Sequence, residues 1–274
     1  MKQITYFLFF VFFQFLSFGQ SISGLVHLTL GNPSKAITNV TSSGNYLLVK
    51  ESYALSYNNA SKIPNWVAWH VSKDWIGGDV KRSNNFRKDE TLPDNWIKIA
   101  PSEYEDSGFD RGHMCPSGDR TKEKELNSET FLMTNMIPQA PNNNRVTWRL
   151  LEEYCRNLVD QGNELYIYSG AIGIGGEGSY GYANYIGKDS ILVPHYIWKI
   201  ILSIPDGEND IQRINNNTSI ITILMPNNQT VNERPWWYYT TTVDELEKRT
   251  GYDFLTNISF SIQEVLESKK FEKE

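Results

Sequence analysis

Short aromatic and β-branched segments recur irregularly along this chain, and only two segments between them have strong helical signals. The strand-like segments are residues 65–71, 164–169, 191–204 and 220–225. One helix is predicted over residues 146–159, where apolar residues recur at helical spacing. A second is predicted from a capping box at Thr242 to Arg249, with Gly251 just beyond it. Because no repeat or linker interrupts this pattern, we expect one α+β domain with a mixed or antiparallel sheet and packed helices.

The composition supports a packed core and limits the kinds of partner. Hydrophobic residues make up 40% of the chain and charged residues 21%, which excludes a mainly disordered, collagen-like or coiled-coil protein. The formal net charge is -6, so binding to a polyanion requires a local basic patch. Only two cysteines are present, which excludes a Cys-based zinc finger and a dense disulfide framework.

The N-terminus has the pattern of a signal peptide. Lys2 precedes an apolar stretch over residues 4–18, which ends in small residues typical of a cleavage site. The stretch is shorter than the roughly twenty apolar residues of a membrane span. We therefore expect a signal peptide over residues 1–19, a single domain over residues 20–274, a secreted or periplasmic location and no membrane contact after cleavage. The alternative is an uncleaved anchor.

A glycine-rich segment resembles a dinucleotide-binding motif but lacks its context. Residues 173–178 match G-x-G-x-x-G after a predicted strand. A dinucleotide site requires a helix that begins at the glycines, whereas the residues that follow are rich in tyrosine and glycine. We interpret this segment as a loop.

The four histidines differ in their surroundings. His27, His70 and His195 lie in strand-like or proline-flanked segments, where we expect structural roles. His113 ends an Asp-Arg-Gly-His tetrad at residues 110–113, which brings a histidine that can accept a proton near neutral pH close to an acid and a base. The alternative is a turn that contains a hydrogen-bonded histidine.

Asn144, Trp148 and Glu152 are spaced four residues apart. On an α-helix Asn144 and Glu152 would differ by about 80° in direction. An amide oxygen and a carboxylate on neighbouring turns can share one hard cation and its waters, as Mg²⁺ prefers. The alternative is that Asn144 caps the helix and Glu152 is solvated.

Three segments resemble the DNA/RNA non-specific endonucleases, which are ββα-metal (His-Me finger) nucleases of the endonuclease G type. They are residues 109–120 (FDRGHMCPSGDR), 134–139 (TNMIPQ) and 144–152 (NRVTWRLLE). The resemblance implies a ββα-metal nuclease core, with the histidine at the end of a β-hairpin and the metal-binding asparagine entering a helix. It also implies Mg²⁺-dependent hydrolysis of DNA and RNA to 5′-phosphate products, with Mn²⁺ as a substitute metal.

The same resemblance assigns roles to residues. His113 would be the general base, and Asn144 the direct protein ligand of Mg²⁺. Glu152 would hold metal-bound waters, and Arg111 would stabilise charge at phosphorus. Asn135 would position the phosphate or the imidazole.

Further residues complete this expected site. Asp110 is expected to orient the hairpin, and Arg82 to add a phosphate contact. The resemblance implies binding of DNA and RNA through the phosphate backbone, without base specificity. Since the chain as a whole is acidic, such binding requires a local basic cleft. Its candidate residues are Arg111, Arg120, Lys122, Arg145 and Arg149. The alternative for these charges is an ordinary solvated face, and the choice between a monomer and a homodimer stays open.

Two other function classes are considered. One is a catalytically silent nucleic-acid-binding module. The other is a secreted polysaccharide-active protein, which the aromatic residues 236–239 suggest. It would require paired carboxylates and would leave the Asp-Arg-Gly-His tetrad unexplained.

The two cysteines lie close to the expected site. Cys115 follows His113 by two residues, and Cys155 lies on the predicted helix that begins near Asn144. The expected export would place them in an oxidising compartment, so we predict a disulfide between them. The alternative is two buried free thiols.

Overall fold

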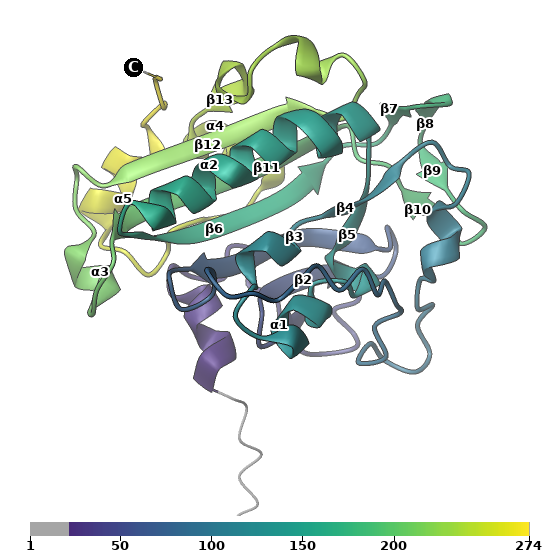
Figure 1. Cartoon of the computed structure of the whole chain (residues 1–274), viewed down its shortest axis with the longest axis horizontal. Helices are drawn as coiled ribbons and strands as arrows, with labels where there is room; N and C mark the ends of the chain where they lie inside the picture. The colour runs from purple at the N-terminus through teal and green to yellow at the C-terminus, as the bar shows by residue number, and fades with distance from the viewer. Residues whose placement is uncertain (1–21, 274) are drawn as a thin grey trace, which may run out of the picture.

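The computed structural model describes residues 22–273, and its centre is a seven-stranded antiparallel sheet (Figure 1). In their order across the sheet the strands are β1 (Tyr46–Val49), β2 (Ala54–Asn58), β3 (Ile63–Val71), β6 (Asn163–Ile172), β11 (Tyr196–Pro205), β12 (Ser219–Pro226) and β13 (Thr240–Thr241). Each neighbouring pair is antiparallel. The predicted α+β class with an antiparallel sheet is confirmed. The predicted signal peptide, residues 1–19, lies outside the described residues.

One predicted strand is divided in the structure. Residues 191–204 were expected to form one strand, but β10 (Ile191–Leu192) pairs with β9 (Tyr185–Ile186) and β11 begins only at Tyr196. Pro194 lies in the break. Proline has no N–H to donate to a ladder, so it separates the two strands.

Two hydrophobic cores lie on opposite faces of the sheet. In β11, Ile197 and Ile201 belong to the first core, whereas Trp198, Ile200 and Leu202 belong to the second. This alternation follows from the two-residue period of a strand. Because both faces are buried, β11 reads as an almost continuous apolar run.

The first core is covered by the elements that carry the candidate site. They are β4 (Asp110–His113), β5 (Met136–Gln139), the π-helical turn η5 (Asn143–Trp148) and α2 (Arg149–Asp160). Figure 1 shows α2 running along the sheet. The buried residues Leu151, Cys155 and Val159 recur every four residues and form the contact face of α2. The predicted helix is therefore confirmed, although a π-helical turn precedes its regular part.

The second core is closed by the C-terminal helices α4 (Val243–Thr250) and α5 (Phe260–Glu267). The predicted capping box is confirmed, because Thr242 Oγ1 accepts a hydrogen bond from the Glu245 N–H at 3.1 Å. The helix ends at Gly251, whose φ of 72° is the left-handed conformation that glycine adopts readily.

Shorter elements connect these layers. They are η1 (Ile22–Leu28), η2 (Pro101–Tyr104), η3 (Ser117–Asp119), α1 (Lys124–Glu129), η4 (Met133–Asn135), β7 (Gly176–Gly178), β8 (Gly181–Ala183), α3 (Asp210–Arg213), η6 (Val231–Glu233) and η7 (Trp236–Tyr239). The glycine-rich segment that was predicted to be a loop contains β7, which pairs with β8 in a short hairpin. No helix in residues 22–273 is both long enough and apolar enough to cross a membrane.

The predicted disulfide was wrong, because Cys115 and Cys155 are free and buried. The Cys115 thiol donates to the Ser52 carbonyl (3.9 Å), whereas Cys155 packs from α2 into the first core. Burial raises the pKa of Cys155 to about 12 and raises that of Cys115 well above its ordinary value. Neither sulfur is therefore a ready thiolate for disulfide exchange.

Candidate active site

The Asp-Arg-Gly-His tetrad forms β4, the first strand of a hairpin. In the register with β5, Asp110 is opposite Gln139 and His113 is opposite Met136. Gly112 is required because a Cβ at this position would lie 2.2 Å from Gln139 Oε1 and 2.6 Å from Gln139 Cβ. The glycine of the tetrad thus lets the Gln139 side chain cross the hairpin.

The His113 side chain is held in a tight aromatic enclosure. Its ring centroid lies 5.4 Å from that of Phe86 and 4.9 Å from that of Phe131, both with edge-to-face geometry. The ring donates to the Arg111 carbonyl, and Nε2 is buried without a hydrogen-bond partner among residues 22–273. Nδ1 is therefore the donor, and Nε2 keeps a free lone pair. Burial, followed by the positive charge of Arg82, lowers the pKa of His113 to about 3.

Two arginines lie beside this imidazole on aromatic rings. The Arg82 guanidinium lies 4.8 Å from the centroid of Phe131, and the Arg111 guanidinium lies 4.6 Å from that of Phe86. Arg82 Nη1 also donates to Ser117 Oγ at 3.0 Å. The arginine–aromatic contacts hold both positive charges on the two rings that enclose His113.

Asn144 lies in the π-helical turn and is fixed by the hairpin. Its Nδ2 donates to Asp110 Oδ2 at 2.8 Å. The same carboxylate accepts from Arg145 Nε at 2.8 Å and from Arg145 Nη2 at 2.6 Å. Since the amide nitrogen of Asn144 donates to Asp110, its Oδ1 is the side-chain atom left to accept a hydrogen bond or bind a cation. Asp110 therefore joins β4 to the π-helical turn, and such turns are frequent at functional sites.

Glu152 lies two turns further along the helix and is half-buried. Burial raises its pKa to about 7, while the positive charges of Lys199, Arg156 and Arg82 act in the opposite direction. Arg82 is thus electrostatically coupled to both His113 and Glu152. The structure therefore brings the hairpin residues and the helix residues of the predicted site together.

Comparison with known proteins decides the family. The model of the DNA/RNA non-specific endonucleases matches residues 30–261. This chain belongs to that family. A nuclease from Nostoc sp. is 48% identical over 244 residues, which cover 89% of this chain and 85% of that protein.

More distant relatives agree with this assignment. Nuclease C1 from Cunninghamella echinulata var. echinulata is 28% identical, over 78% of this chain and 84% of that protein. A crystal structure of EndoG in the EndoG/EndoGI complex shares the fold, with a TM-score of 0.71 and 23% identity over 86% of this chain and 92% of that chain. The chain is therefore an endonuclease, as predicted. The silent binding module and the polysaccharide-active protein are not supported.

The Asn135 side chain of this nuclease hydrogen-bonds only to the backbone of the described residues. It is fully buried, and its Oδ1 accepts from the Cys115 N–H at 3.0 Å. Its Nδ2 donates to the carbonyls of Cys115 and Thr130, both at 2.8 Å. Phosphate contact is excluded because both amide hydrogens are used inside the protein. Asn135 instead fixes the backbone two residues beyond His113.

The predicted basic cleft was wrong in part. Arg120 is fully buried, donates to the carbonyls of Ser52 and His70, and lies over the Trp75 ring at 4.2 Å. The Arg120 guanidinium is used inside the protein, because the carbonyls of Ser52 and His70 are buried and accept its hydrogen bonds. Arg145 and Arg149 are exposed but paired with acidic residues, Asp110 and Glu153 respectively, and Lys122 is exposed. The cations beside His113 are Arg82 and Arg111.

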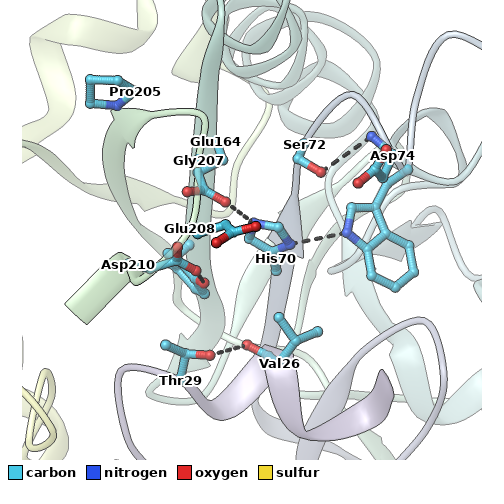
Figure 2. Close-up of polar contacts among 12 residues, drawn as sticks. Val26, Thr29, His70, Ser72, Asp74, Glu164, Pro205, Gly207, Glu208 and Asp210 are labelled. Atoms are coloured by element: carbon cyan, nitrogen blue, oxygen red, sulfur yellow. Dashed lines mark hydrogen bonds and ion pairs between the residues drawn. The ribbon is translucent and has the colours of Figure 1, made fainter. Parts of the chain in front are cut away.

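Two of the other histidines have both ring nitrogens occupied. His70 Nδ1 accepts from Trp75 Nε1 at 3.0 Å, and its Nε2 contacts Glu164 Oε2 at 2.8 Å (Figure 2). His27 Nδ1 accepts from the His70 N–H, and its Nε2 contacts the Glu51 carbonyl. Neither residue has a free lone pair for catalysis, in agreement with their expected structural roles.

Sequence reasoning missed residues that come from distant segments. Phe86 and Phe131 enclose the imidazole, but nothing near them in the sequence indicates that contact. Lys199 did leave a signal, because it interrupts the apolar run of β11. Its Nζ lies 4.4 Å from the Trp148 ring and 5.3 Å from the Trp69 ring, below the helix that carries Glu152.

Proposed function

We propose that this nuclease is an exported, Mg²⁺-dependent enzyme that cuts both DNA and RNA without sequence preference and leaves 5′-phosphate ends, with Mn²⁺ as a substitute metal. The proposal rests on the buried, unpartnered Nε2 of His113, whose ring is enclosed by two phenylalanines that each carry an arginine. A buried polar atom without a partner costs free energy, so its retention at this position is consistent with a role in chemistry.

The residues present fit a divalent cation. Asn144 offers an amide oxygen whose orientation is fixed through Asp110. Glu152 offers a carboxylate with no ion pair within 4 Å among the described residues. Hard oxygen ligands of this kind suit Mg²⁺. When bound, the cation would polarise the phosphate and stabilise the leaving oxygen.

His113 can serve as the general base for water. Its Nε2 takes a proton from the attacking water while the P–O3′ bond breaks. The imidazolium that forms is stabilised by the bond from Nδ1 to the Arg111 carbonyl. Phe86 and Phe131 hold the ring in one orientation.

The arginines link substrate binding to the strength of the base. Arg82 and Arg111 attract the scissile phosphate as positive charges held in fixed positions. Without substrate, burial and then the charge of Arg82 lower the pKa of His113. A bound phosphate places negative charge beside Arg82 and offsets this effect, so the pKa of His113 rises when substrate binds.

A plasmid assay tests the proposed activity. The purified protein should cut supercoiled plasmid and structured RNA with Mg²⁺ or Mn²⁺, and should be inactive in EDTA. The ends should be joined by DNA ligase without prior treatment by a kinase. Full activity in EDTA, or ends that require phosphorylation at the 5′ position, would contradict the proposed chemistry.

Export is tested separately. Its support is the apolar stretch over residues 4–18 after Lys2. The protein recovered from the periplasm or the culture medium should begin at Gln20. A protein of full mass that stays with the membrane fraction would favour the anchor instead.

A further inference from the structure

A pocket of about 280 Å³ opens beside the hairpin formed by β7 and β8. Its walls include Glu177 and Tyr182 from the hairpin, His195 and Tyr196 from the start of β11, and Asn228 beyond β12. Figure 1 shows β7 and β8 projecting near the N-terminal end of α2, which is the end that follows Asn144.

Hydrogen bonds connect the pocket wall to the catalytic segments. Asn227, which also lines the pocket, donates from Nδ2 to the Pro138 carbonyl at 3.0 Å and accepts at Oδ1 from the Ala140 N–H at 2.7 Å. Asn143 Nδ2 donates to the carbonyl of Pro226, another wall residue, at 2.9 Å. The pocket is therefore attached to the residue that precedes Asn144.

The hairpin is attached to the other catalytic segment. The Ser179 N–H donates to the Gly108 carbonyl at 2.8 Å, two residues before Asp110. Gly108 has a φ of 79°, and a Cβ there would lie 2.9 Å from the Tyr180 backbone nitrogen. The glycine thus allows the hairpin to lie directly against the strand that leads to His113.

The pocket has aromatic walls and polar groups. Tyr182 is 65% exposed, so most of its side chain is accessible to a ligand. The rings of His195 and Tyr196 are 4.5 Å apart in an edge-to-face pair. His195 donates from Nδ1 to the Gly175 carbonyl at 3.0 Å, which leaves Nε2 as an acceptor.

The charge of the pocket excludes phosphate as its occupant. None of the residues that line it is a lysine or an arginine, and the Glu177 carboxylate would repel a phosphate. The same carboxylate, the amide of Asn228 and Nε2 of His195 can pair with the amino and ring nitrogens of a nucleobase. An aromatic, polar and anionic pocket therefore favours a base over the backbone.

We propose that this pocket is a nucleobase subsite, which takes one unpaired base of the strand cut at the adjacent active site. The inference rests on the proposed function, because it places the substrate strand between His113 and the hairpin. A base in a duplex is stacked on both sides and paired, so only an unpaired base can enter and stack on Tyr182. The nuclease therefore prefers single strands or locally open duplexes.

Binding without cleavage tests the subsite. In EDTA, the anisotropy of a fluorescein-labelled single-stranded DNA 12-mer is measured with the wild type, Tyr182→Ala and Tyr182→Phe. Loss of one stacking contact should weaken Kd by about 10-fold in Tyr182→Ala, and Tyr182→Phe should keep wild-type binding. Tyr238→Ala is the matched control, because Tyr238 is 63% exposed but lies in η7 and does not line the pocket.

Abasic substrates identify what the pocket holds. Each position of the 12-mer is replaced in turn by an abasic site, and cleavage by the wild type is followed with Mg²⁺. One position near the scissile phosphate should show a loss of about 10-fold in kcat/KM, and this loss should vanish in Tyr182→Ala. Equal Kd values for the wild type and Tyr182→Ala, or no sensitive position, would overturn the subsite. Binding as expected without any hydrolysis would instead contradict the proposed function.

Discussion

Asn144 donates its side-chain amide to the carboxylate of Asp110 at 2.8 Å, across the contact between the π-helical turn and the β-hairpin. The two residues are 34 positions apart, yet this bond fixes which atom of the amide is free. The first residue of the Asp-Arg-Gly-His tetrad thus acts on the proposed metal ligand, while the last residue is the proposed base. One short strand sets the relative positions of both.

Asp110→Ala should lower activity by about 10- to 100-fold and raise the Mg²⁺ concentration needed for half-maximal activity, because Asn144 loses its orientation. Asp110→Asn keeps an acceptor oxygen and should be less affected. Arg145→Ala is the control, since it removes the other partner of the carboxylate and leaves the Asn144 bond intact. A Mg²⁺ titration of all three variants measures the effect, and equal curves for Asp110→Ala and the wild type would contradict it.

His113→Ala should reduce hydrolysis by about 10²- to 10⁴-fold, because proton transfer from water loses its acceptor. Binding of DNA in EDTA should stay within about 3-fold of the wild type, since Arg82 and Arg111 remain. Single-turnover cleavage and anisotropy measure the two effects. A variant that keeps more than about a tenth of the wild-type rate would show that another group is the base.

Asn144→Ala should lose metal-dependent activity, and Glu152→Ala should lose less. The reason is that Asn144 offers the direct ligand atom, whereas Glu152 is expected to orient metal-bound waters. The decisive measurement is the Mg²⁺ dependence of each variant at saturating DNA. If Asn144→Ala keeps the wild-type metal requirement, the cation binds elsewhere.

The parts of the fold and of the site that follow from local sequence were predicted well. The capping box at Thr242 and the helix that contains Glu152 depend on residues within one or two turns of each other. The π-helical turn over residues 143–148 was not predicted, because it depends on bonds from Asn143 to Pro226 and from Asn144 to Asp110. Such partners are remote in the sequence.

Charged residues and cysteines show the same limit more clearly. Arg120 reads as a surface cation, but it is buried against the carbonyls of Ser52 and His70. Cys115 and Cys155 were expected to meet, but the thiol of Cys115 contacts Ser52 instead. In each case the contacts of the side chain depend on how separate layers of the fold pack together. Sequence periodicity predicts the individual helices and strands but not these contacts.

Glu267, on α5, has a carboxyl group that is unusually costly to ionise. The residue is 7% exposed, and its Oε1 is buried without a hydrogen-bond partner among residues 22–273. Burial raises its pKa from 4.5 to about 7, and the charges of Glu247, Asp244 and Asp253 act in the same direction, against a hydrogen bond from Gln263. These acids come from α4 and the segment that follows it, and the carboxylate oxygens of Asp244, Glu247 and Glu267 lie within 4.8 Å of one another.

This raised pKa should make the folded protein less stable as pH rises from about 4.5 to 7. In that window the folded state keeps the Glu267 proton and the unfolded state has lost it, so the free energy of unfolding falls with pH. Glu267→Gln should remove this loss and stabilise the protein by about 1–3 kcal/mol at pH 8, with little effect at pH 4.5. Glu264→Gln is the matched control, because Glu264 is exposed on the same helix. Urea unfolding at several pH values measures the difference. Equal stability of the two variants at pH 8 would mean that the Glu267 carboxyl group ionises in the folded protein without penalty, contrary to this prediction.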